Sequence, residues 1–417
     1  MKILYLCADP GIPVLGDKGA SVHVRGLAAA LSRAGHAVVV AAPQIDAGPW
    51  GDAAPLAART LGLGPSPAVV SVHQALKRFN AVVGARNSVP NAVRRILLNE
   101  ELRAELARRF ADAPPDIVYE RASLYGTAGV QLARDLGTPL IVELNAPLAA
   151  EQSAYRAPGL GELAEHAERW LLSEADAVLA VSGPLREHAV SLGAAPARVH
   201  VMPNGVDPAL FQPGLRDPDV RKRWGLGDGP VLGVVSGLRP WHGVDALPPL
   251  LEQLAPRHPD LRVVVVGDGP LRAPLARDFA ARGLERAVVF TGWLAHGEVA
   301  ALIRHFDVAL APYREPEQAF YFSPLKLFEY MACGVPVVGA AVGQIAEVVR
   351  DGETGLLYAP GDTEALALAC DRVLTDSALS ERLGAAAAAA IHGRYTWDHN
   401  AARVAKVARA LLDGTAP

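Results

Sequence analysis

The chain has 417 residues, which is more than one ordinary hydrophobic core organises, so we expect two domains. Its net charge of −4 gives no electrostatic basis for binding nucleic acid. Three scattered cysteines argue against a disulfide framework and a zinc site and favour a reducing cytoplasm. No apolar run reaches the roughly 18 residues that span a bilayer, and the apolar start at 1–7 has the length of a strand, not of a signal peptide.

Short β-rich apolar runs alternate with helical patterns through the first half of the chain. Between the first two runs, Val24, Leu27 and Leu31 fall on one helical face, and Gly35 ends that helix. This alternation predicts a parallel sheet covered on both faces. The expected strands are 3–7, 37–41, 68–72, 117–119, 140–143, 177–181 and 199–202.

Residues 74–110 are expected to form a helical insertion, with helices at 74–79 and 92–110. Two interpretations of its arginines stay open. They could contact an anionic membrane face or an anionic acceptor, or Glu100, Glu101 and Glu105 could balance them on a solvated helix, which is the commoner outcome for a charge run. Trp50 and Phe79 are further candidate neighbours of an acceptor. The arginines are Arg94, Arg95, Arg103, Arg108 and Arg109.

A second series of strands begins near residue 230, so the chain predicts two doubly wound domains. The proposed division is 1–203, 204–395 and a C-terminal segment 396–417, whose amphipathic helix at 397–412 packs on the first domain. The Asp217-Pro218-Asp219 triplet is expected in a solvated loop, not at a metal site, and no metal is required. The expected strands are 231–235, 261–266, 288–291, 308–311, 335–338 and 355–358.

Three segments carry candidate chemistry, two of them directly after expected strands and the third in front of one. The first turn, at 9–24, contains Gly16 and Gly19 and opens a helix whose start would attract a phosphate, although it lacks the spacing of a dinucleotide-binding loop. The segment 236–245 follows the first strand of the second half, where Arg239 could grip a diphosphate and His242 could donate to it.

The third segment runs from Ser323 to Val338 and combines a turn, a helix start and a buried strand. Free N–H groups at the helix start, together with Lys326, suit a diphosphate, and Glu329 one turn later could accept hydrogen bonds from sugar hydroxyls. The alternative is an amphipathic helix whose polar residues only face water.

The order and spacing of several motifs resemble family 4 of the retaining glycosyltransferases, in a variant with an SPLKLFEYMA-type donor motif, over nearly the whole chain. The motifs are 18–25, 181–182, 203–207 with Phe211, 267–270, 290–292, 307–312, 328–332 and 334–338. The resemblance implies the GT-B fold, with two Rossmann-like domains facing each other across a cleft. It also implies a second domain that binds a nucleotide-diphosphate sugar, UDP-linked in preference to GDP-linked.

The resemblance assigns site residues to this chain. Arg239, Lys326 and Asn145 are the expected catalytic residues, Asn145 standing where the family often has a histidine. The expected donor-binding residues are Gly16, Gly19, Gly237, His242, Gly269, Ser323, Pro324, Leu325 and Glu329. Glu329 matches the second glutamate of the family's E-x7-E motif, whereas the first falls on Tyr321, with Glu317 nearby but out of register.

The resulting hypothesis is transfer of a hexosyl unit to a hydroxyl of a small-molecule, glycan or lipid-linked acceptor with retention, by front-face attack, because no carboxylate pair suits double displacement. No tightly bound cofactor is expected, and the location is cytoplasmic, at the inner membrane face if the insertion contacts lipid. The Ala, Arg, Gly and Pro bias is typical of a GC-rich bacterial genome. Tyr321 and Asn145 keep a non-catalytic sugar-nucleotide-binding subunit open, and the shared two-domain fold keeps a sugar-nucleotide epimerase open.

Overall fold

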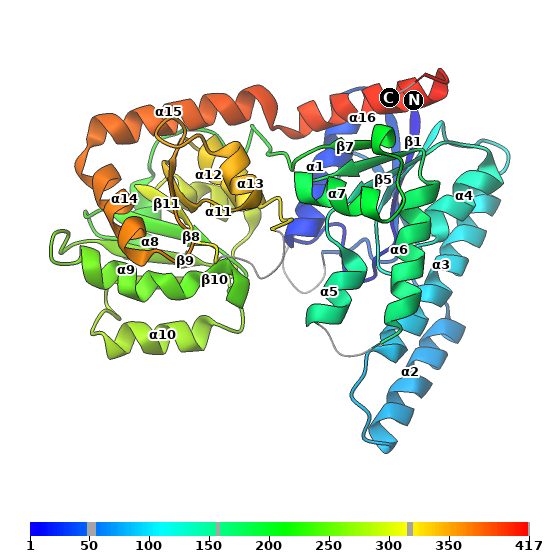
Figure 1. Ribbon diagram of the computed structural model, residues 1–417, viewed down its shortest axis with the longest axis horizontal. Coiled ribbons are helices and arrows are strands. Elements are labelled where there is room, and N and C mark those ends of the chain that lie inside the picture. Colours follow the sequence, from blue (N-terminus) through cyan, green and yellow to red (C-terminus); the bar gives the residue numbers. More distant parts are fainter. Residues whose placement is uncertain (48–55, 156–158, 315–319, 416–417) are drawn as a thin grey trace. The chain divides into compact units, whose positions relative to one another are not determined.

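The computed structural model describes residues 1–47, 56–155, 159–314 and 320–415, and its contacts divide the chain into two compact units (Figure 1). Unit 1 consists of Met1–Pro203, Tyr321–Ser323 and Trp397–Pro417. Unit 2 consists of Asn204–Phe320 and Pro324–Thr396.

Unit 1 is built on a parallel sheet with the strand order β3-β2-β1-β4-β5-β6-β7. Its Val-, Ile- and Leu-rich central strands are buried on both faces, as expected for a sheet with helices on each side. The strands are β1 (Lys2–Cys7), β2 (Ala37–Ala42), β3 (Arg59–Gly62), β4 (Ile117–Arg121), β5 (Leu140–Leu144), β6 (Ala177–Ala180) and β7 (Val199–Val201). The helices are α1 (Gly19–Arg33), α2 (Pro67–Val82), α3 (Val89–Phe110), α4 (Ala128–Leu136), α5 (Leu148–Tyr155), α6 (Gly161–Glu174), α7 (Gly183–Ser191) and α16 (Trp397–Leu412).

The strand predicted at 68–72 is wrong, because these residues lie in the first turns of α2. Pro67 occupies the start of the helix, where its fixed φ fits and its missing N–H costs nothing. The Ser66 hydroxyl accepts the Val69 N–H at 3.3 Å and caps the helix. These two start signals outweigh the β propensity of the valines that follow, and the sheet takes β3 as its edge strand.

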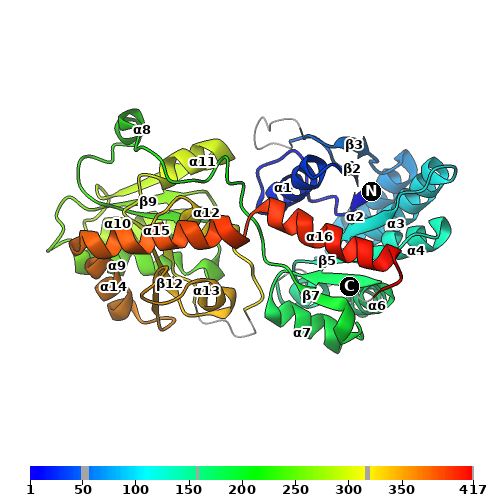
Figure 2. The same ribbon diagram turned by 90° about the horizontal axis from the view of Figure 1, so that it is seen from above.

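The C-terminal helix α16 packs on α1 within unit 1 (Figure 2). Gly26 makes this close approach possible, because a Cβ there would lie 2.4 Å from the indole nitrogen of Trp397. The Trp397 ring also meets the His23 ring edge-to-face, with centroids 4.8 Å apart. Arg33 pairs with Asp398 at 2.7 Å, and the Asn400 amide donates to the Pro203 carbonyl at 2.9 Å.

Unit 2 has a second parallel sheet, with the order β10-β9-β8-β11-β12-β13. The strands are β8 (Val231–Val235), β9 (Arg262–Val266), β10 (Val288–Gly292), β11 (Val308–Ala311), β12 (Val337–Ala340) and β13 (Leu356–Tyr358). The helices are α8 (Pro218–Arg223), α9 (Leu247–Leu254), α10 (Arg272–Ala281), α11 (His296–Ile303), α12 (Leu325–Ala332), α13 (Gly343–Val348), α14 (Thr363–Thr375) and α15 (Ser377–Arg394).

The predicted α/β architecture with two Rossmann-like parallel sheets is confirmed. In each sheet the strand order reverses next to the first strand of the series, between β1 and β4 in unit 1 and between β8 and β11 in unit 2. Open α/β sheets bind ligands outside the carboxyl ends of the strands at such a switch point. Within the described ranges, every helix is too short or too polar to cross a bilayer.

Candidate active site

The loops at the switch point of unit 2 are packed against one another through glycines. Gly243 ends the turn of 3-10 helix at Pro240–His242 with a φ of 65°, and a Cβ there would lie 1.6 Å from the Pro312 carbonyl oxygen. Gly269 similarly lies against the backbone of Gly237, whose carbonyl oxygen would be 2.1 Å from an added Cβ. The loops after β8, β9 and β11 therefore pack together along the carboxyl edge of the sheet. Gly269 allows two of these loops to approach closely.

His242 is a neutral hydrogen-bonding group in this edge. Its Nδ1 lies 2.7 Å from the Ser236 hydroxyl and 3.4 Å from the Arg239 backbone N–H. Burial, together with the nearby charges of Lys326 and Arg239, lowers the pKa of His242 to about 2. Because the Arg239 N–H can only donate, Nδ1 is the acceptor, and the ring proton lies on Nε2. His242 can donate one hydrogen bond to a ligand, but it does not add the positive charge considered from the sequence.

Lys326 lies in the first turn of α12, whose start has no side-chain cap and no acidic residue. Its ammonium lies 4.8 Å from the centroid of the Tyr313 ring. Burial lowers the pKa of Lys326 to about 7, and the Glu329 charge opposes this effect. No hydrogen bond or ion pair joins its Nζ to another described residue. A partly desolvated ammonium beside free helix N–H groups is an arrangement that favours an anionic ligand.

Glu329 is held one turn beyond Lys326, on the buried side of α12. His296, the first residue of α11, contacts Glu329 Oε1 through its Nε2 at 2.7 Å. Oε2 has no hydrogen-bond partner among the described residues, so this oxygen remains able to accept a bond from a ligand. Tyr330 anchors the same helix, because its hydroxyl accepts the Val235 N–H at 2.6 Å.

The remaining predicted donor-binding residues of this half lie around this edge of the sheet or where the chain passes from unit 1 to unit 2. Gly237 directly follows Ser236, and the exposed Arg239 makes no ion pair with any described side chain. Pro324 and Leu325 form the start of α12 in unit 2, whereas Ser323 is assigned to unit 1. The structure thus brings Arg239, His242, Lys326 and Glu329 into one region of unit 2.

The predicted residues of the first turn belong to unit 1. Gly16 is buried, and a Cβ there would meet the Ala47 carbonyl oxygen at 2.8 Å, so this glycine serves loop packing. The Arg25 guanidinium donates to the Gly16 carbonyl and lies 3.5 Å from Asp17. Gly19 begins α1, whose start lacks a side-chain cap and acidic residues. The helix start is therefore available to an anion, as the sequence predicts.

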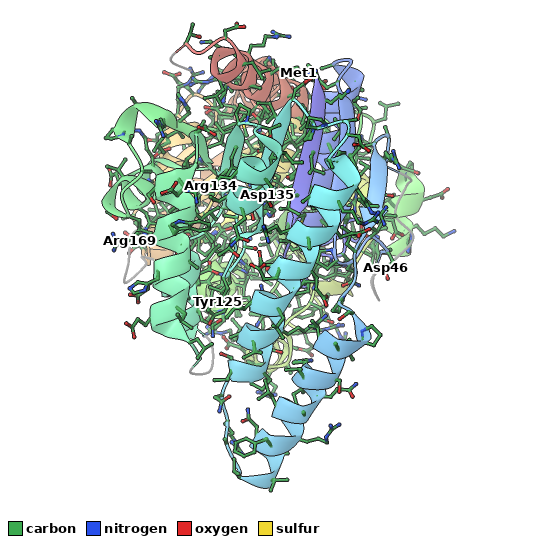
Figure 3. The ribbon with its side chains drawn as sticks, turned by 90° about the vertical axis from the view of Figure 1, so that its right-hand side faces the viewer. Met1, Asp46, Tyr125, Arg134, Asp135 and Arg169 are labelled. Carbon is green, nitrogen blue, oxygen red and sulfur yellow. The ribbon has the colours of Figure 1, made fainter. Side chains whose placement is uncertain are left out.

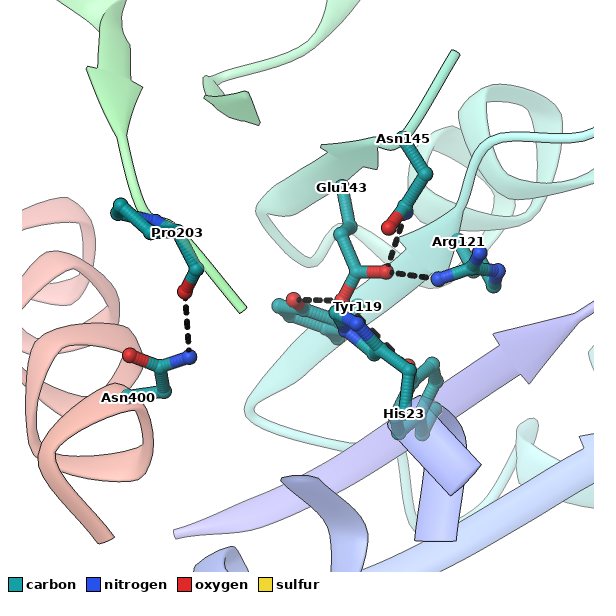
Figure 4. A network of polar contacts seen from close by, with 8 residues as sticks. His23, Tyr119, Arg121, Glu143, Asn145, Pro203 and Asn400 are labelled. Carbon is teal, nitrogen blue, oxygen red and sulfur yellow. Dashed lines mark hydrogen bonds and ion pairs between the residues drawn. The ribbon is translucent and has the colours of Figure 1, made fainter. Parts of the chain in front are cut away.

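A buried polar network lies at the carboxyl ends of β4 and β5, next to the switch point of unit 1 (Figure 4). Glu143 Oε2 lies 2.7 Å from His23 Nε2 and accepts the Tyr119 hydroxyl at 2.6 Å. Glu143 Oε1 accepts Arg121 and Asn145 at 2.6 and 2.5 Å. Burial alone would raise the pKa of Glu143, but the His23 and Arg121 side chains hold it well below its usual value.

Asn145 and Tyr321, the two residues that depart from the family motifs, form hydrogen bonds within unit 1. The Asn145 amide donates to Glu143 and is fixed by it. Tyr321 accepts the Ser182 hydroxyl at its carbonyl, at 2.8 Å, and its own hydroxyl bonds Glu151. The residue aligned with the first glutamate of the motif is therefore engaged in unit 1 through hydrogen bonds. Trp50 and Glu317 lie outside the described residues.

Unit 1 also contains a cavity of about 420 Å³. It lies between the loop after β1, the start of α3, the β4–α4 loop and α5. Its lining is mixed in polarity, and Arg94 makes no ion pair with another described residue. Tyr125 adopts a left-handed backbone conformation there, with φ 63°. Polar lining residues include Ser88, Asn91, Arg94, Arg95, Tyr125 and Gln152.

The described residues include no cluster of three or more His, Cys, Asp or Glu side chains that could hold a metal ion. Asp217 instead caps α8 and accepts the Asp219 N–H at 2.9 Å. Sequence reasoning missed His296, Tyr313, Glu143 and Arg121. Apart from Asn145, which follows Glu143 by two positions, their polar and cation–π partners lie 13 to 138 positions away. Only the placement of Glu143 and Arg121 at strand ends hinted at their role.

Comparisons with known proteins agree with this geometry. Residues 18–205 match the model of the glycosyl transferase 4-like domain, and residues 229–376 match that of glycosyl transferases group 1. The D-inositol 3-phosphate glycosyltransferase of Stackebrandtia nassauensis is 34% identical over 73% of this chain and 69% of its own length. The glycogen synthase of Mycobacterium tuberculosis is 26% identical over 99% of this chain and 96% of its own.

Among solved structures, Anabaena HepE in complex with UDP covers 98% of this chain and is itself covered completely, with a TM-score of 0.71 and 21% identity. The fold is therefore that of the GT-B glycosyltransferases. The chain belongs to the group 1, glycosyltransferase 4-like family.

Proposed function

We propose that the protein is a retaining glycosyltransferase that transfers a hexosyl unit from a nucleotide-diphosphate sugar, UDP-linked in preference to GDP-linked, to an acceptor hydroxyl. The observation that carries this proposal is the group of basic side chains at the switch point of unit 2. Lys326 and Arg239 form no ion pair with another described residue, and Lys326 lies at the uncapped start of α12. HepE, which shares the fold, binds UDP.

The proposed chemistry is electrostatic. As the bond between the anomeric carbon and the diphosphate breaks, Lys326, Arg239 and the α12 N–H groups stabilise the growing negative charge. Neutral His242 donates its Nε2–H to the same diphosphate, and Glu329 Oε2 accepts a ribose hydroxyl. The acceptor oxygen bonds to the anomeric carbon on the face that the diphosphate leaves, and a departing phosphate oxygen takes the acceptor proton.

We place the acceptor on unit 1, in the cavity lined by Asn91, Arg94 and Gln152. Several amide and hydroxyl groups suit a hydroxyl-rich acceptor, whether a small molecule, a glycan or a lipid-linked sugar. Asn145 is proposed to act at the reacting sugar, oriented by Glu143. No step requires a metal, because the basic groups supply the positive charge. The three free cysteines suit a reducing, cytoplasmic location.

The test begins with thermal-shift screening of UDP-, GDP-, ADP- and TDP-sugars, since a ligand that binds only the native state raises its melting temperature. The best donor is then incubated with and without an acceptor panel, and the product's anomeric configuration is determined by NMR. Free UDP formed only with acceptor, with a retained anomer, is the expected result. An inverted product contradicts retention, an isomerised donor indicates an epimerase, and binding without turnover indicates a non-catalytic subunit.

A further inference from the structure

The helix α2 exposes an unusual amount of apolar surface. Of its residues with a described environment, Val69 alone is buried. The segment 70–83 carries five of the twelve large apolar side chains that are exposed in the described parts of the chain. Together α2 and α3 form a helical hairpin that extends beyond the sheet of unit 1 (Figure 3). We call the end of this hairpin, residues 72–88, the hairpin tip.

The exposed side chains of the hairpin tip share one side of α2. Val72, Phe79 and Val82 are separated by seven and three positions, so they follow one another along a helical face, and Val83 lies beside them. Their exposed fractions are 41, 62, 86 and 54% in chain order. Two hydrogen bonds join α2 to the returning half of the hairpin: His73 bonds Asn91 at 2.9 Å, and Asn80 bonds Asn87 at 2.9 Å. The hairpin therefore closes on its polar side and leaves its apolar stripe in solvent.

The charge around the stripe has one sign. Residues 53–99 contain six basic residues and no Asp or Glu. Lys77, Arg78 and Arg86, on the hairpin tip, make no ion pair with another described residue. The six are Arg59, Lys77, Arg78, Arg86, Arg94 and Arg95, of which Arg95 pairs with Asp9 at 3.1 Å.

The acidic residues of α3 do not neutralise the hairpin tip. Glu105 pairs with Arg108 and Arg109 at 2.9 and 2.5 Å, and Glu100 lies 3.6 Å from Arg103. Glu101 accepts the Ser66 N–H at 3.0 Å. These contacts all lie on the part of α3 beyond residue 99, so the balanced charge expected over 74–110 holds only for that part.

We propose that the hairpin tip docks the protein on an anionic lipid surface. Phe79, Val82 and Val83 enter the headgroup region, while Lys77, Arg78 and Arg86 lie against lipid phosphates. The combination of apolar side chains, unbalanced positive charge and no helix able to span a bilayer is the pattern of an interfacial element. An uncharged protein surface would need no such excess of positive charge.

Vesicle co-sedimentation of the full chain tests this proposal. We expect binding to vesicles of phosphatidylglycerol and phosphatidylcholine, weakening as salt is added, and little binding to phosphatidylcholine alone. The apolar variant F79S/V82S/V83S and the charge variant K77Q/R78Q/R86Q should each bind the anionic vesicles at least tenfold more weakly. Matched controls are L215S/L368S, at exposed leucines of unit 2, and K222Q/R277Q/R286Q, which should bind as the unaltered protein does.

A second readout reports insertion directly. Tryptophan fluorescence of F79W should be quenched by brominated lipids, whereas L215W should show no added quenching. Unchanged UDP-induced thermal shifts verify that each variant is folded. Absence of wild-type binding to anionic vesicles would overturn the proposal, as would equal losses in the hairpin and control variants. If the unaltered protein is a dimer that does not bind vesicles, and F79S/V82S/V83S converts it to a monomer, the hairpin tip contacts a second copy of the chain instead.

Discussion

The charged side chains at the carboxyl edges of the two sheets differ in whether they are paired. In unit 1, Glu143 accepts hydrogen bonds from the side chains around it, and Arg121 faces it at 2.6 Å. In unit 2, the ammonium of Lys326 lies over the Tyr313 ring at the uncapped start of α12 and forms no ion pair with another described residue, although the Glu329 charge lies one turn away. A partly desolvated charge without an ion-pair partner is costly, so we interpret the Lys326 region as a candidate site that a ligand would complete.

The same contrast distinguishes positioning from binding. The Glu143 network is complete without a ligand and holds Asn145 and His23 in place, and Trp397 of the C-terminal helix packs on that histidine. The Lys326 ammonium, by contrast, has no ion-pair partner among the described residues. We therefore expect substitution of Glu143 to act mainly on stability and substitution of Lys326 to act mainly on function.

Replacing Glu143 should have the largest effect. Glu143→Gln removes the charge that Arg121 faces and leaves a buried guanidinium unpaired, which costs about 3–5 kcal/mol of unfolding free energy. Hydrogen exchange followed by mass spectrometry on peptides that cover β4 and β5 measures this loss within unit 1, independently of unit 2.

Glu120 supplies the matched control. It precedes Arg121 on β4 and points to the opposite face of the sheet, toward Gly129 of α4. Burial raises its pKa to about 8, so it is mainly protonated at pH 7 and resembles a glutamine. Glu120→Gln should therefore change the opening free energy measured by hydrogen exchange by less than about 1 kcal/mol at pH 7. Equal losses in the two variants would remove the distinction between paired and unpaired charge.

Replacing Lys326 by methionine should have the next largest effect, on turnover. Loss of one preorganised group that stabilises transition-state charge lowers kcat by about 10²–10³-fold. Since Lys326 is desolvated without an anion, the same change should leave the unfolding free energy unchanged or raise it. Steady-state kinetics and urea unfolding of the same preparation provide both quantities. A Lys326→Met protein that is active, or that is less stable by more than about 1 kcal/mol, would contradict the assignment.

The contrast also explains which parts of the molecule were predictable. Strands of unit 2 such as Val231–Val235 and Val308–Ala311 were expected at their observed bounds, because buried parallel strands are continuous apolar runs. Arg239 and His242 were predicted because they follow the strand Val231–Val235, where the switch-point rule applies, and Lys326 was predicted because it lies at a helix start. The charge state of His242 was not, since it depends on burial and on the distant Lys326.

The Glu143 network could not be predicted, because its members come from α1, β4, β5 and the residue after β5. His23 and Glu143 are 120 positions apart, and only the sheet register places Arg121 beside Glu143. Likewise, residues 68–72 at the start of α2 were taken for a strand because of their valines, whereas the Ser66 cap and Pro67 decide the local structure. Tertiary contacts and capping chemistry account for these errors.

Replacing Glu329 should weaken donor binding more than it changes turnover. Glu329→Ala removes a charged acceptor of ligand hydroxyls, which is worth about 1.5–3 kcal/mol, or at least tenfold in Kd. Isothermal titration with the best nucleotide sugar measures this directly. His296→Gln keeps a donor beside Glu329 Oε1 and should lose much less affinity. If both variants bind as tightly as the unaltered protein, Glu329 is not a ligand-binding residue.

The smallest effect is a pH dependence that belongs to Lys326 alone. Its pKa of about 7 in the free protein is below the usual value, so the ammonium is lost as pH rises through 7. A bound diphosphate favours the protonated form and raises that pKa, and binding above pH 7 therefore takes up a proton. UDP affinity should fall by up to about tenfold per pH unit above 7.

Lys326→Arg isolates this effect, because a guanidinium stays protonated over the whole range. His242 cannot contribute, since its pKa of about 2 keeps it neutral. Titration of both proteins with UDP from pH 6.5 to 9 should therefore show a slope that the arginine variant lacks. An identical slope in the two proteins would mean that Lys326 is fully protonated without ligand. The lowered pKa of Lys326 would then no longer distinguish the proposed donor site.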